Sequence, residues 1–367
     1  MIEPLLKQLE IAPVMGRFHP LWPLCLPTNV EIVSSAQMVA ERLDRLESHH
    51  ERPILITEYA PAFTDRFLSY HLPECPPPNL VNIALPTRIA TNHHLLTHRR
   101  IGQRIVNDTR KHNYETVILM LVDGLSYEDT RHWPYHSIPC LITAPSITFT
   151  RANNKILPDV GFPAIVGDFS IARQLAQVGI PHSRGYSYWE RGQNDVSAFL
   201  FSGMPLTKVD GVSETLTTLE QIDLQGLYVQ LVREGTDGLA HSRREVTPLE
   251  IQATVGAILY DFQQLIELLA KSKRKSAAYL VSDHGILWKQ QHALERIPHE
   301  TSDHARYTWK KPANSAHAIA FPTEKGNCYL YNYPYVGRQL RANDSGTHGG
   351  LSYWESIVPF IHVEVNV

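Results

Sequence analysis

A carboxylate and an imidazole stand four residues apart in the connector that runs from Val232 to Val246, VREGTDGLAHSRREV. These residues are Asp237 and His241, and both types of side chain bind Zn²⁺ and related divalent ions. Taken alone, the pattern is explained more simply as a turn, because Asp and Gly are common turn formers. Whether it is a metal site depends on what the rest of the chain brings to the same place.

An aspartate, in one case together with a histidine, follows each strongly apolar segment of the chain. Asp123 follows the segment Thr116–Val122, Asp237 follows Leu227–Val232, and Asp283 and His284 follow Ala277–Val281. Such runs predict strands that are buried on both faces of a parallel sheet. A further histidine, His348, stands among glycines in Gly346–Gly350. Because ligands bind outside the carboxyl ends of the strands in doubly wound sheets, we expect these residues to meet at one sheet edge.

Three carboxylates and three imidazoles at one sheet edge predict metal ions. Each residue by itself is explained more simply by a turn, a helix N-cap or a loop. Together they are not, because such groups repel one another or stay unsatisfied unless cations lie between them. Oxygen and nitrogen ligands without sulfur suit two divalent ions, Zn²⁺ first and Mn²⁺ as the alternative. Ions paired in this way serve in-line displacement at phosphorus.

A nucleophile for this chemistry is expected between the first two motifs, in the segment PSITFTR from Pro145 to Arg151. Read locally, the segment is a strand end whose hydroxyls cap the next segment. Beside two ions, however, the hydroxyl of Thr148 can ionise and attack phosphorus. Thr150 is a second hydroxyl close by, and the fork of Arg151 suits phosphoryl oxygens, which makes it a candidate for substrate binding.

The order of these residues resembles the alkaline phosphatase superfamily, whose members carry an Asp, a Ser or Thr nucleophile, Asp-x-x-x-His, Asp-His and a final His. In this chain the order is Asp123, Thr148, Asp237 with His241, Asp283 with His284, and His348. Within the superfamily, the chain is most similar to the PglZ-domain family, in the segments Val122–Tyr127, Pro145–Thr148 and Gly346–Pro359. The resemblance covers residues 114–367, about two thirds of the chain.

The resemblance implies an α/β fold with an alkaline-phosphatase-like, mostly parallel sheet sandwiched by helices. It also implies that one ion is held by Asp237, His241 and His348, and that the other is held by Asp123, Asp283, His284 and the Thr148 oxygen. Thr148 would then attack phosphorus and form a covalent intermediate. The implied activity is that of a cytoplasmic phosphoesterase acting on phosphodiesters of nucleotides or nucleic acid. The implied setting is a bacterial phage-defence system of the BREX type, with protein partners docked through the N-terminal region.

Two other functions fit the same residues. A phosphomonoesterase or phosphomutase of the superfamily would use the same site, and a non-catalytic subunit of a defence complex would hold the metals for stability. A sulfatase is disfavoured, because Cys140–Ala144 lacks the pattern C-x-P-S-R. The chain also departs from the PglZ-domain family in the segment Arg151–Pro158, which is more polar than the family pattern. We expect His292–Lys311 to be a solvated loop, with a cap over the site as the alternative.

Further elements are predicted around these strands. Helices are expected over Ser35–Ser48, His98–His112, Phe169–Val178 and from Thr247 to about Lys271, with a short strand over Pro53–Thr57. The last helix opens with Thr-Pro-Leu-Glu, a capping box with Pro at the first helical position. Pro-rich connectors distinguish the first part of the sequence from the rest. We therefore expect residues 1–112 to form a smaller accessory domain and residues 113–367 to form the PglZ domain.

The composition narrows the functional class. The 367 residues carry 34 Lys and Arg against 37 Asp and Glu, so the chain as a whole lacks the polycationic character of indiscriminate nucleic-acid binders. No apolar run approaches the roughly 18 residues that span a bilayer, and no signal-peptide pattern stands at the start. The four cysteines are far apart and fit reduced thiols. A cytoplasmic location without a membrane partner is expected.

Overall fold

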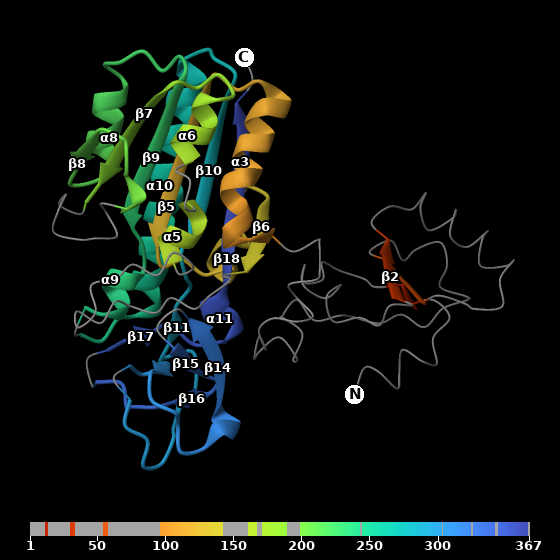
Figure 1. Cartoon of the computed structure of the whole chain (residues 1–367), viewed down its shortest axis with the longest axis vertical. Helices are drawn as coiled ribbons and strands as arrows, with labels where there is room; N and C mark the ends of the chain where they lie inside the picture. Colours follow the sequence, from red (N-terminus) through yellow and green to blue (C-terminus); the bar gives the residue numbers. More distant parts are fainter. Residues whose placement is uncertain are drawn as a thin grey trace, which may run out of the picture. The chain divides into compact units, whose positions relative to one another are not determined.

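A computed structural model describes most of the chain after residue 95 (Figure 1). The described ranges are 96–141, 161–166, 171–188, 199–242, 244–302, 304–323, 326–341 and 344–365, together with the backbone of 12–13, 30–33 and 54–57. The chain divides into two compact units, Met1–Asn92 and His93–Val367. The predicted features that lie outside the described residues include the helix Ser35–Ser48, the candidate nucleophile Thr148, the neighbouring hydroxyl of Thr150, and Arg151.

The first unit contains a parallel sheet of three short strands in the order β1-β3-β2. These strands are β1 (Ala12–Pro13), β2 (Val30–Val33) and β3 (Ile54–Thr57). Strand β3 confirms the strand predicted for this segment. The domain boundary after residue 112 and the accessory role of the N-terminal region stay predictions.

The second unit is built on an eight-stranded sheet in the order β4-β6-β18-β10-β5-β9-β7-β8. Its strands are β4 (Leu96–Thr97), β5 (Thr116–Asp123), β6 (Ser137–Leu141), β7 (His182–Ser187), β8 (Leu206–Lys208), β9 (Leu227–Glu234), β10 (Ser276–Ser282) and β18 (Ile357–Val365). Strand β18 runs antiparallel to both of its neighbours, and the other pairings are parallel. The predicted mostly parallel sheet is thus confirmed.

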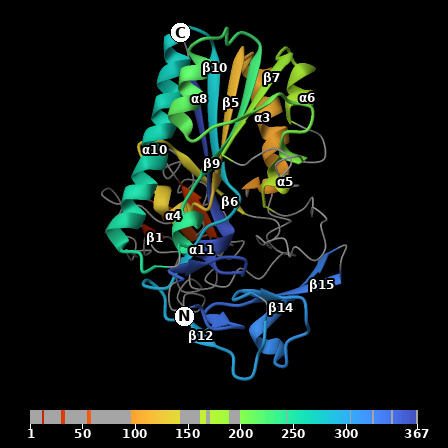
Figure 2. The same cartoon turned by 90° about the vertical axis from the view of Figure 1, so that its left-hand side faces the viewer.

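Helices cover both faces of this sheet (Figure 2). One layer contains α3 (His98–His112), α5 (Gly161–Val166) and α6 (Ile171–Ala176), and the other contains α8 (Val212–Leu219) and α10 (Pro248–Lys271). Alternate residues of β5 point to opposite faces. Leu119 therefore packs in the core beneath α3, whereas Met120 packs in the core beneath α10. Burial on both faces explains why this strand is apolar throughout.

Three predicted helices fall in these layers, and the one expected over Phe169–Val178 is present as the shorter α6 (Ile171–Ala176). Helix α10 begins at the predicted capping box, where Thr247 Oγ1 accepts a hydrogen bond from the Glu250 backbone N–H at 3.3 Å and Glu250 Oε2 accepts one from the Thr247 N–H at 2.8 Å. Helix α3 confirms the helix predicted over His98–His112; it lies in the second unit and packs against α5 and α6. None of the described helices combines the length and the apolar character that a bilayer crossing requires.

Small elements extend the unit beyond the carboxyl ends of the strands. They are α4 (Tyr127–Thr130), α9 (Asp237–Ala240), β11 (Leu287–Trp288), β12 (Glu295–Arg296), β13 (Tyr307–Thr308), β14 (Ala318–Thr323), β15 (Gly326–Tyr331), β16 (Tyr335–Val336), β17 (Gly346–Thr347) and α11 (Tyr353–Ser356). Figure 1 shows the strands β14 to β17 gathered below the main sheet. The solvated loop expected over His292–Lys311 is wrong in its central part, because Ala305, Arg306 and Tyr307 are at most 2% exposed.

Candidate metal centre

Six of the predicted site residues come together at the carboxyl edge of the sheet. Asp123 is the last residue of β5, Asp237 is the first residue of α9, His241 follows α9, Asp283 and His284 follow β10, and His348 follows β17. The groups that can hold a metal ion are Asp237 with His284 and His348, and Asp123 with Asp283 and His284. The convergence expected from the strand ends is therefore present among the described residues.

The carboxylate of Asp237 faces three imidazoles. Its Oδ1 lies 3.4 Å from His241 Nε2, 3.9 Å from His284 Nε2 and 3.4 Å from His348 Nε2. These distances exceed those of N–H···O hydrogen bonds, and this buried oxygen has no hydrogen-bond partner among the described residues. Two ligand atoms bound tetrahedrally at about 2.0–2.2 Å from one ion lie about 3.4 Å apart. The separations thus fit side chains that share a cation.

The second group of ligands adjoins the first through His284. The Nε2 atom of His284 lies 3.6 Å from Asp123 Oδ1 and 3.7 Å from Asp283 Oδ1. The sequence resemblance assigns His284 to the Asp123 and Asp283 group alone, whereas in the structure its Nε2 also lies near Asp237. His241 belongs to neither group, although its Nε2 lies 3.4 Å from Asp237 Oδ1. The assignment of each ligand to one ion stays a prediction.

The cluster opens to solvent on one side. The side chain of His241 is 42% exposed, whereas those of His284 and His348 are 3% and 2% exposed. The rings of His284 and His348 stack with centroids 4.0 Å apart and an interplanar angle of 18°. A substrate can therefore approach from the side of His241, whereas the stacked rings of His284 and His348 are buried.

Burial shifts the protonation of the cluster. It raises the pKa of Asp283 to about 8, where His284 opposes the shift and Asp123 adds to it. Burial lowers the pKa of His284, but the carboxylates of Asp283, Asp237 and Asp123 outweigh this and bring the pKa to about 10. Burial also raises the pKa of Asp237. Without metal, the cluster therefore retains protons that a divalent ion would displace.

Backbone hydrogen bonds fix the three acidic loops to one another. The Gly124 N–H donates to Asp283 Oδ1 at 3.2 Å, and the Gly124 carbonyl accepts from both the N–H and the Oγ1–H of Thr236 at 2.8 Å. The Leu125 N–H donates to the His284 carbonyl at 2.8 Å. The loops after β5, β9 and β10 consequently form one rigid layer beneath the ligands.

Gly235 is required by this close approach. A Cβ atom at Gly235 would lie 2.2 Å from the Asp123 carbonyl oxygen and 2.6 Å from that of Gly124. A Cβ at Gly238 would meet only the side chain of Glu234, at 2.3 Å. The expectation that a glycine here permits a tight approach therefore has its clearest physical basis at Gly235, where backbone packs on backbone.

A buried ion pair holds the loop that carries His348. The guanidinium of Arg306 donates from Nε and Nη2 to the two carboxylate oxygens of Glu355, both at 2.9 Å, and both side chains are 0% exposed. Glu355 Oε1 also accepts the Gly350 N–H at 2.9 Å, two residues beyond His348. The ion pair therefore sets the path of the glycine-rich loop, through a contact that spans 49 residues of sequence.

Tyr188 is a site residue that the sequence did not reveal. Its hydroxyl donates to Asp123 Oδ2 at 2.5 Å, so it orients one of the candidate ligands. Burial, reinforced by the charge of Asp123, raises the pKa of Tyr188, so the hydroxyl stays protonated as a donor. The residue stands just after β7 in no recognisable motif, and β9 lies between β7 and β5 in the sheet, so only the folded chain shows the contact with Asp123.

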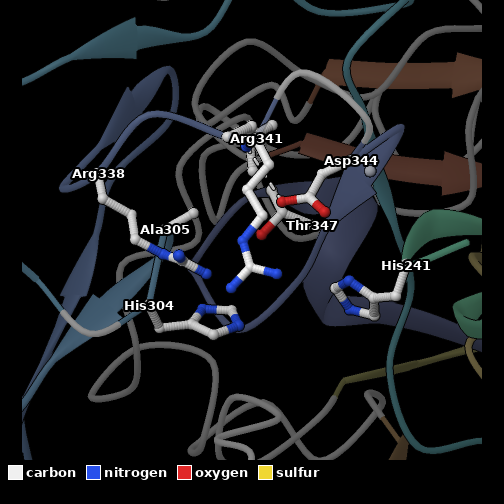
Figure 3. Close-up of a pocket in the computed structure, with 9 residues that line it drawn as sticks. His241, His304, Ala305, Arg338, Arg341, Asp344 and Thr347 are labelled. Atoms are coloured by element: carbon white, nitrogen blue, oxygen red, sulfur yellow. Dashed lines mark hydrogen bonds between the residues drawn. The ribbon is translucent and has the colours of Figure 1, made fainter. Parts of the chain in front are cut away.

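A pocket of about 190 Å³ adjoins the exposed side of the cluster (Figure 3). The residues that line it are His241, His304, Ala305, Arg338, Leu340, Arg341, Asp344, Gly346 and Thr347. In Figure 3 the side chains of His304, Arg341 and His241 point toward one another across it. Burial, followed by the charge of Arg338, lowers the pKa of His304 to about 3, so this imidazole is neutral.

No family model matches the chain, and no curated protein matches its sequence. Among solved structures, an inactive variant of murine ectonucleotide pyrophosphatase/phosphodiesterase 5 in complex with AMP matches 67% of this chain and 87% of its own, with 14% identity and a TM-score of 0.44. The TAB5 alkaline phosphatase with bound Mg matches 68% of this chain and 91% of its own, with 9% identity and a TM-score of 0.31. The C-terminal periplasmic domain of EcEptC from Escherichia coli, in complex with Zn, matches 69% of this chain and 74% of its own, with 10% identity and a TM-score of 0.33. At such values the functional inference rests on the side chains of this chain.

The stability of the metal-free protein should fall as the pH rises above 7. The pKa values of Asp283 and His284 in the folded state, about 8 and about 10, lie above the ordinary values of 3.8 and 6.5. Between about pH 4 and about pH 10 the native cluster thus holds more protons than the unfolded chain, and its stability decreases most steeply between about pH 6.5 and about pH 8, where both groups contribute. The urea midpoint of EDTA-treated protein measures this, and Zn²⁺ should remove the trend by displacing the protons. The variant Asp283→Asn should show a shallower decrease, and a slope equal to that of the wild type would contradict the assignment.

Breaking the buried ion pair should destabilise the protein and weaken metal binding. Arg306→Ala leaves the Glu355 carboxylate buried without its partner, which lowers the free energy of unfolding by about 3–5 kcal/mol. Because the His348 loop loses its anchor, Zn²⁺ affinity should fall by about 10- to 100-fold. Arg244→Ala is the matched control, since Arg244 pairs with Glu250 at a side-chain exposure of 53%. Equal unfolding midpoints for the two variants would refute the role of Arg306.

Proposed function

We propose that this protein is a two-metal-dependent phosphoesterase of the alkaline phosphatase type, with phosphodiesters of nucleotides or nucleic acid as its favoured substrates. The observation that carries the proposal is the position of Asp237 Oδ1, which lies 3.4–3.9 Å from the Nε2 atoms of three histidines and has no hydrogen-bond partner among the described residues. The adjoining Asp123 and Asp283 carboxylates supply ligands for a second ion. Paired ions of this kind serve displacement at phosphorus.

The donor set supports divalent ions with oxygen and nitrogen preference. One ion would be held by Asp237, His241 and His348, and the other by Asp123, Asp283, His284 and the hydroxyl of Thr148. Zn²⁺ is favoured and Mn²⁺ is the alternative, because the set contains imidazoles and carboxylates and no thiolate. Ions bound there would supply positive charge that stabilises the attacking and the leaving oxygens.

The residues of the chain would carry out the nucleophilic attack and bind the substrate. The Thr148 oxygen attacks phosphorus as its proton is lost, the Thr148 O–P bond forms, and the ester P–O bond on the far side breaks so that the alcohol leaves with a proton. The product is a nucleotidyl-threonine, because the second ester group stays on phosphorus; water then cleaves the Thr148 O–P bond, releases the monoester and regenerates the hydroxyl. Arg151 contacts the phosphoryl oxygens. Tyr188 holds Asp123 in place through its hydrogen bond of 2.5 Å.

The finer assignment within this class rests on the resemblance to the PglZ-domain family. The segment Gly346–Pro359 supports it, and in the structure this segment contains both His348 and Glu355, which anchors the loop around His348. We propose on this basis a role in a phage-defence system of the BREX type, with protein partners docked through the N-terminal region.

The reaction class can be tested with a matched pair of substrates. Bis(p-nitrophenyl) phosphate is a diester and p-nitrophenyl phosphate is the corresponding monoester, and both release the same coloured product. We expect hydrolysis of the diester to dominate, to stop on chelation and to return with Zn²⁺ or Mn²⁺. Preference for the monoester would identify a phosphomonoesterase. Bound metal in a folded protein with no turnover of either ester would favour the non-catalytic subunit.

Substitution of the two neighbouring hydroxyls should identify the nucleophile. Thr148→Ala removes the attacking oxygen and should lower kcat for the diester by at least about a thousandfold, because the loss of a nucleophile disables the whole catalytic unit. Thr150→Ala is the matched control and should retain most of the activity. Full activity in Thr148→Ala would sink the covalent mechanism, and an inactive Thr150→Ala beside an active Thr148→Ala would transfer the role to Thr150.

A further inference from the structure

The pocket of about 190 Å³ shares a wall with the metal centre. His241 lines the pocket, and its Nε2 lies 3.4 Å from Asp237 Oδ1 in the metal cluster. The ring of His304, on the pocket wall, has its centroid 5.7 Å from that of His348. A group bound in this pocket would therefore lie beside whatever occupies the metal centre.

The pocket carries an excess of positive charge. Arg338 and Arg341 face a single carboxylate, that of Asp344, which accepts a hydrogen bond from the Arg341 backbone N–H at 3.1 Å. Neither guanidinium forms an ion pair with a carboxylate in the part of the chain that the structure describes. An anion in the pocket would offset the charge of these two guanidiniums, whose N–H groups form charge-assisted hydrogen bonds with anionic oxygens.

The fold holds Arg338 in this place. The preceding Gly337 N–H donates to the Ala305 carbonyl at 2.8 Å, which ties the segment to the residue next to His304. A Cβ atom at Gly337 would lie 2.4 Å from the ring of Tyr331, so only glycine permits the approach. On the other wall, the Ser345 N–H donates to the Ala240 carbonyl at 3.1 Å. Both walls of the pocket are thus attached to the loops of the metal centre.

The size of the pocket suits a phosphoryl group. A volume of about 190 Å³ corresponds to roughly six water molecules at about 30 Å³ each. A phosphoryl group with part of its hydration fits this volume. Charge and size therefore agree on a small anionic group.

We propose that this pocket binds a second phosphoryl group of the substrate through Arg338 and Arg341, while the phosphoryl group to be cleaved lies at the metal centre. The planar fork of an arginine donates two parallel hydrogen bonds to phosphate oxygens. The inference rests on the proposed phosphoesterase function and narrows its substrates to those with a second phosphoryl group close to the reacting one. Such a group comes either from a phosphoanhydride, as in nucleoside triphosphates, or from the neighbouring phosphate of a nucleic-acid strand.

A pair of dinucleotides that differ by one phosphate tests the proposal. The dinucleotide pTpT carries a terminal phosphate that TpT lacks, so the ratio of their kcat/KM values isolates its contribution. We expect the wild-type protein to prefer pTpT by about tenfold or more, the usual effect of one charge-assisted hydrogen bond. Arg338→Gln and Arg341→Gln should each bring the ratio toward one. Arg296→Gln, at an exposed position on β12, is the matched control and should keep the wild-type ratio.

Parallel measurements identify the source of the second phosphate. In the anhydride arm, ATP replaces pTpT and the p-nitrophenyl ester of TMP replaces TpT. If Arg338→Gln removes the preference for ATP but leaves the preference for pTpT, the pocket binds phosphoanhydrides. If it removes the preference for pTpT but leaves the preference for ATP, the pocket binds the neighbouring phosphate of a nucleic acid. Ratios near one in both arms for the wild-type protein, or ratios that Arg338→Gln leaves unchanged, overturn the proposal.

A binding measurement separates this proposal from the proposed function. Calorimetric titration of the Zn²⁺-loaded protein with inorganic pyrophosphate needs no turnover. We expect Arg338→Gln to weaken pyrophosphate binding by about tenfold relative to the wild type and to Arg296→Gln. If no ester is hydrolysed, the phosphoesterase function fails while this titration still decides the pocket. Equal affinity for pyrophosphate in the wild type and in Arg338→Gln refutes the pocket whatever the enzymatic result.

Discussion

The negative charge of Asp237 is the constraint on which the rest of the site depends. Its buried Oδ1 is surrounded by imidazole nitrogens at 3.4–3.9 Å, and two more carboxylates lie across His284. Such a cluster is unfavourable when it is empty, because buried like charges repel and buried groups without partners lose the solvation of water. A cation relieves both penalties at once. The same physical feature that makes the cluster costly to fold therefore makes it a strong metal site.

Two parts of the fold position the ligands around Asp237. The parallel strands β5, β9 and β10 deliver their carboxylates to a common edge, where the backbone of Gly124 is bonded to both neighbouring loops. The chain after β10 returns with His348, held by the buried pair of Arg306 and Glu355. Ser126 connects the two parts, since its Oγ donates to the Trp354 carbonyl at 2.8 Å and accepts the Ile286 N–H at 3.1 Å. The ligands are thus positioned both by the strand ends and by the chain that returns after β10.

Much of the fold could be predicted from the sequence, because its signals are local. Strands β5, β9 and β10 match the apolar runs to within two residues, since burial on both faces requires an unbroken apolar sequence. Helix α10 begins at its capping box and ends at Lys271 as predicted. The burial of Arg306 could not be read in this way, because its carboxylate partner lies 49 residues further along the chain. A basic residue in a polar segment gives no local sign of such a partner.

The sequence by itself determined the types and order of the candidate ligands and the edge at which they meet, because parallel strands end on the same side of a sheet whatever surrounds them. Only the tertiary structure decided which side chains face one another within that edge. It placed His284 between the two groups, brought Tyr188 onto Asp123, and set Arg338 and Arg341 in a pocket beside His241. These positions depend on strand order and on packing between distant segments. Side-chain contacts across such distances leave no periodic pattern in the sequence, so they appear only when the chain is folded.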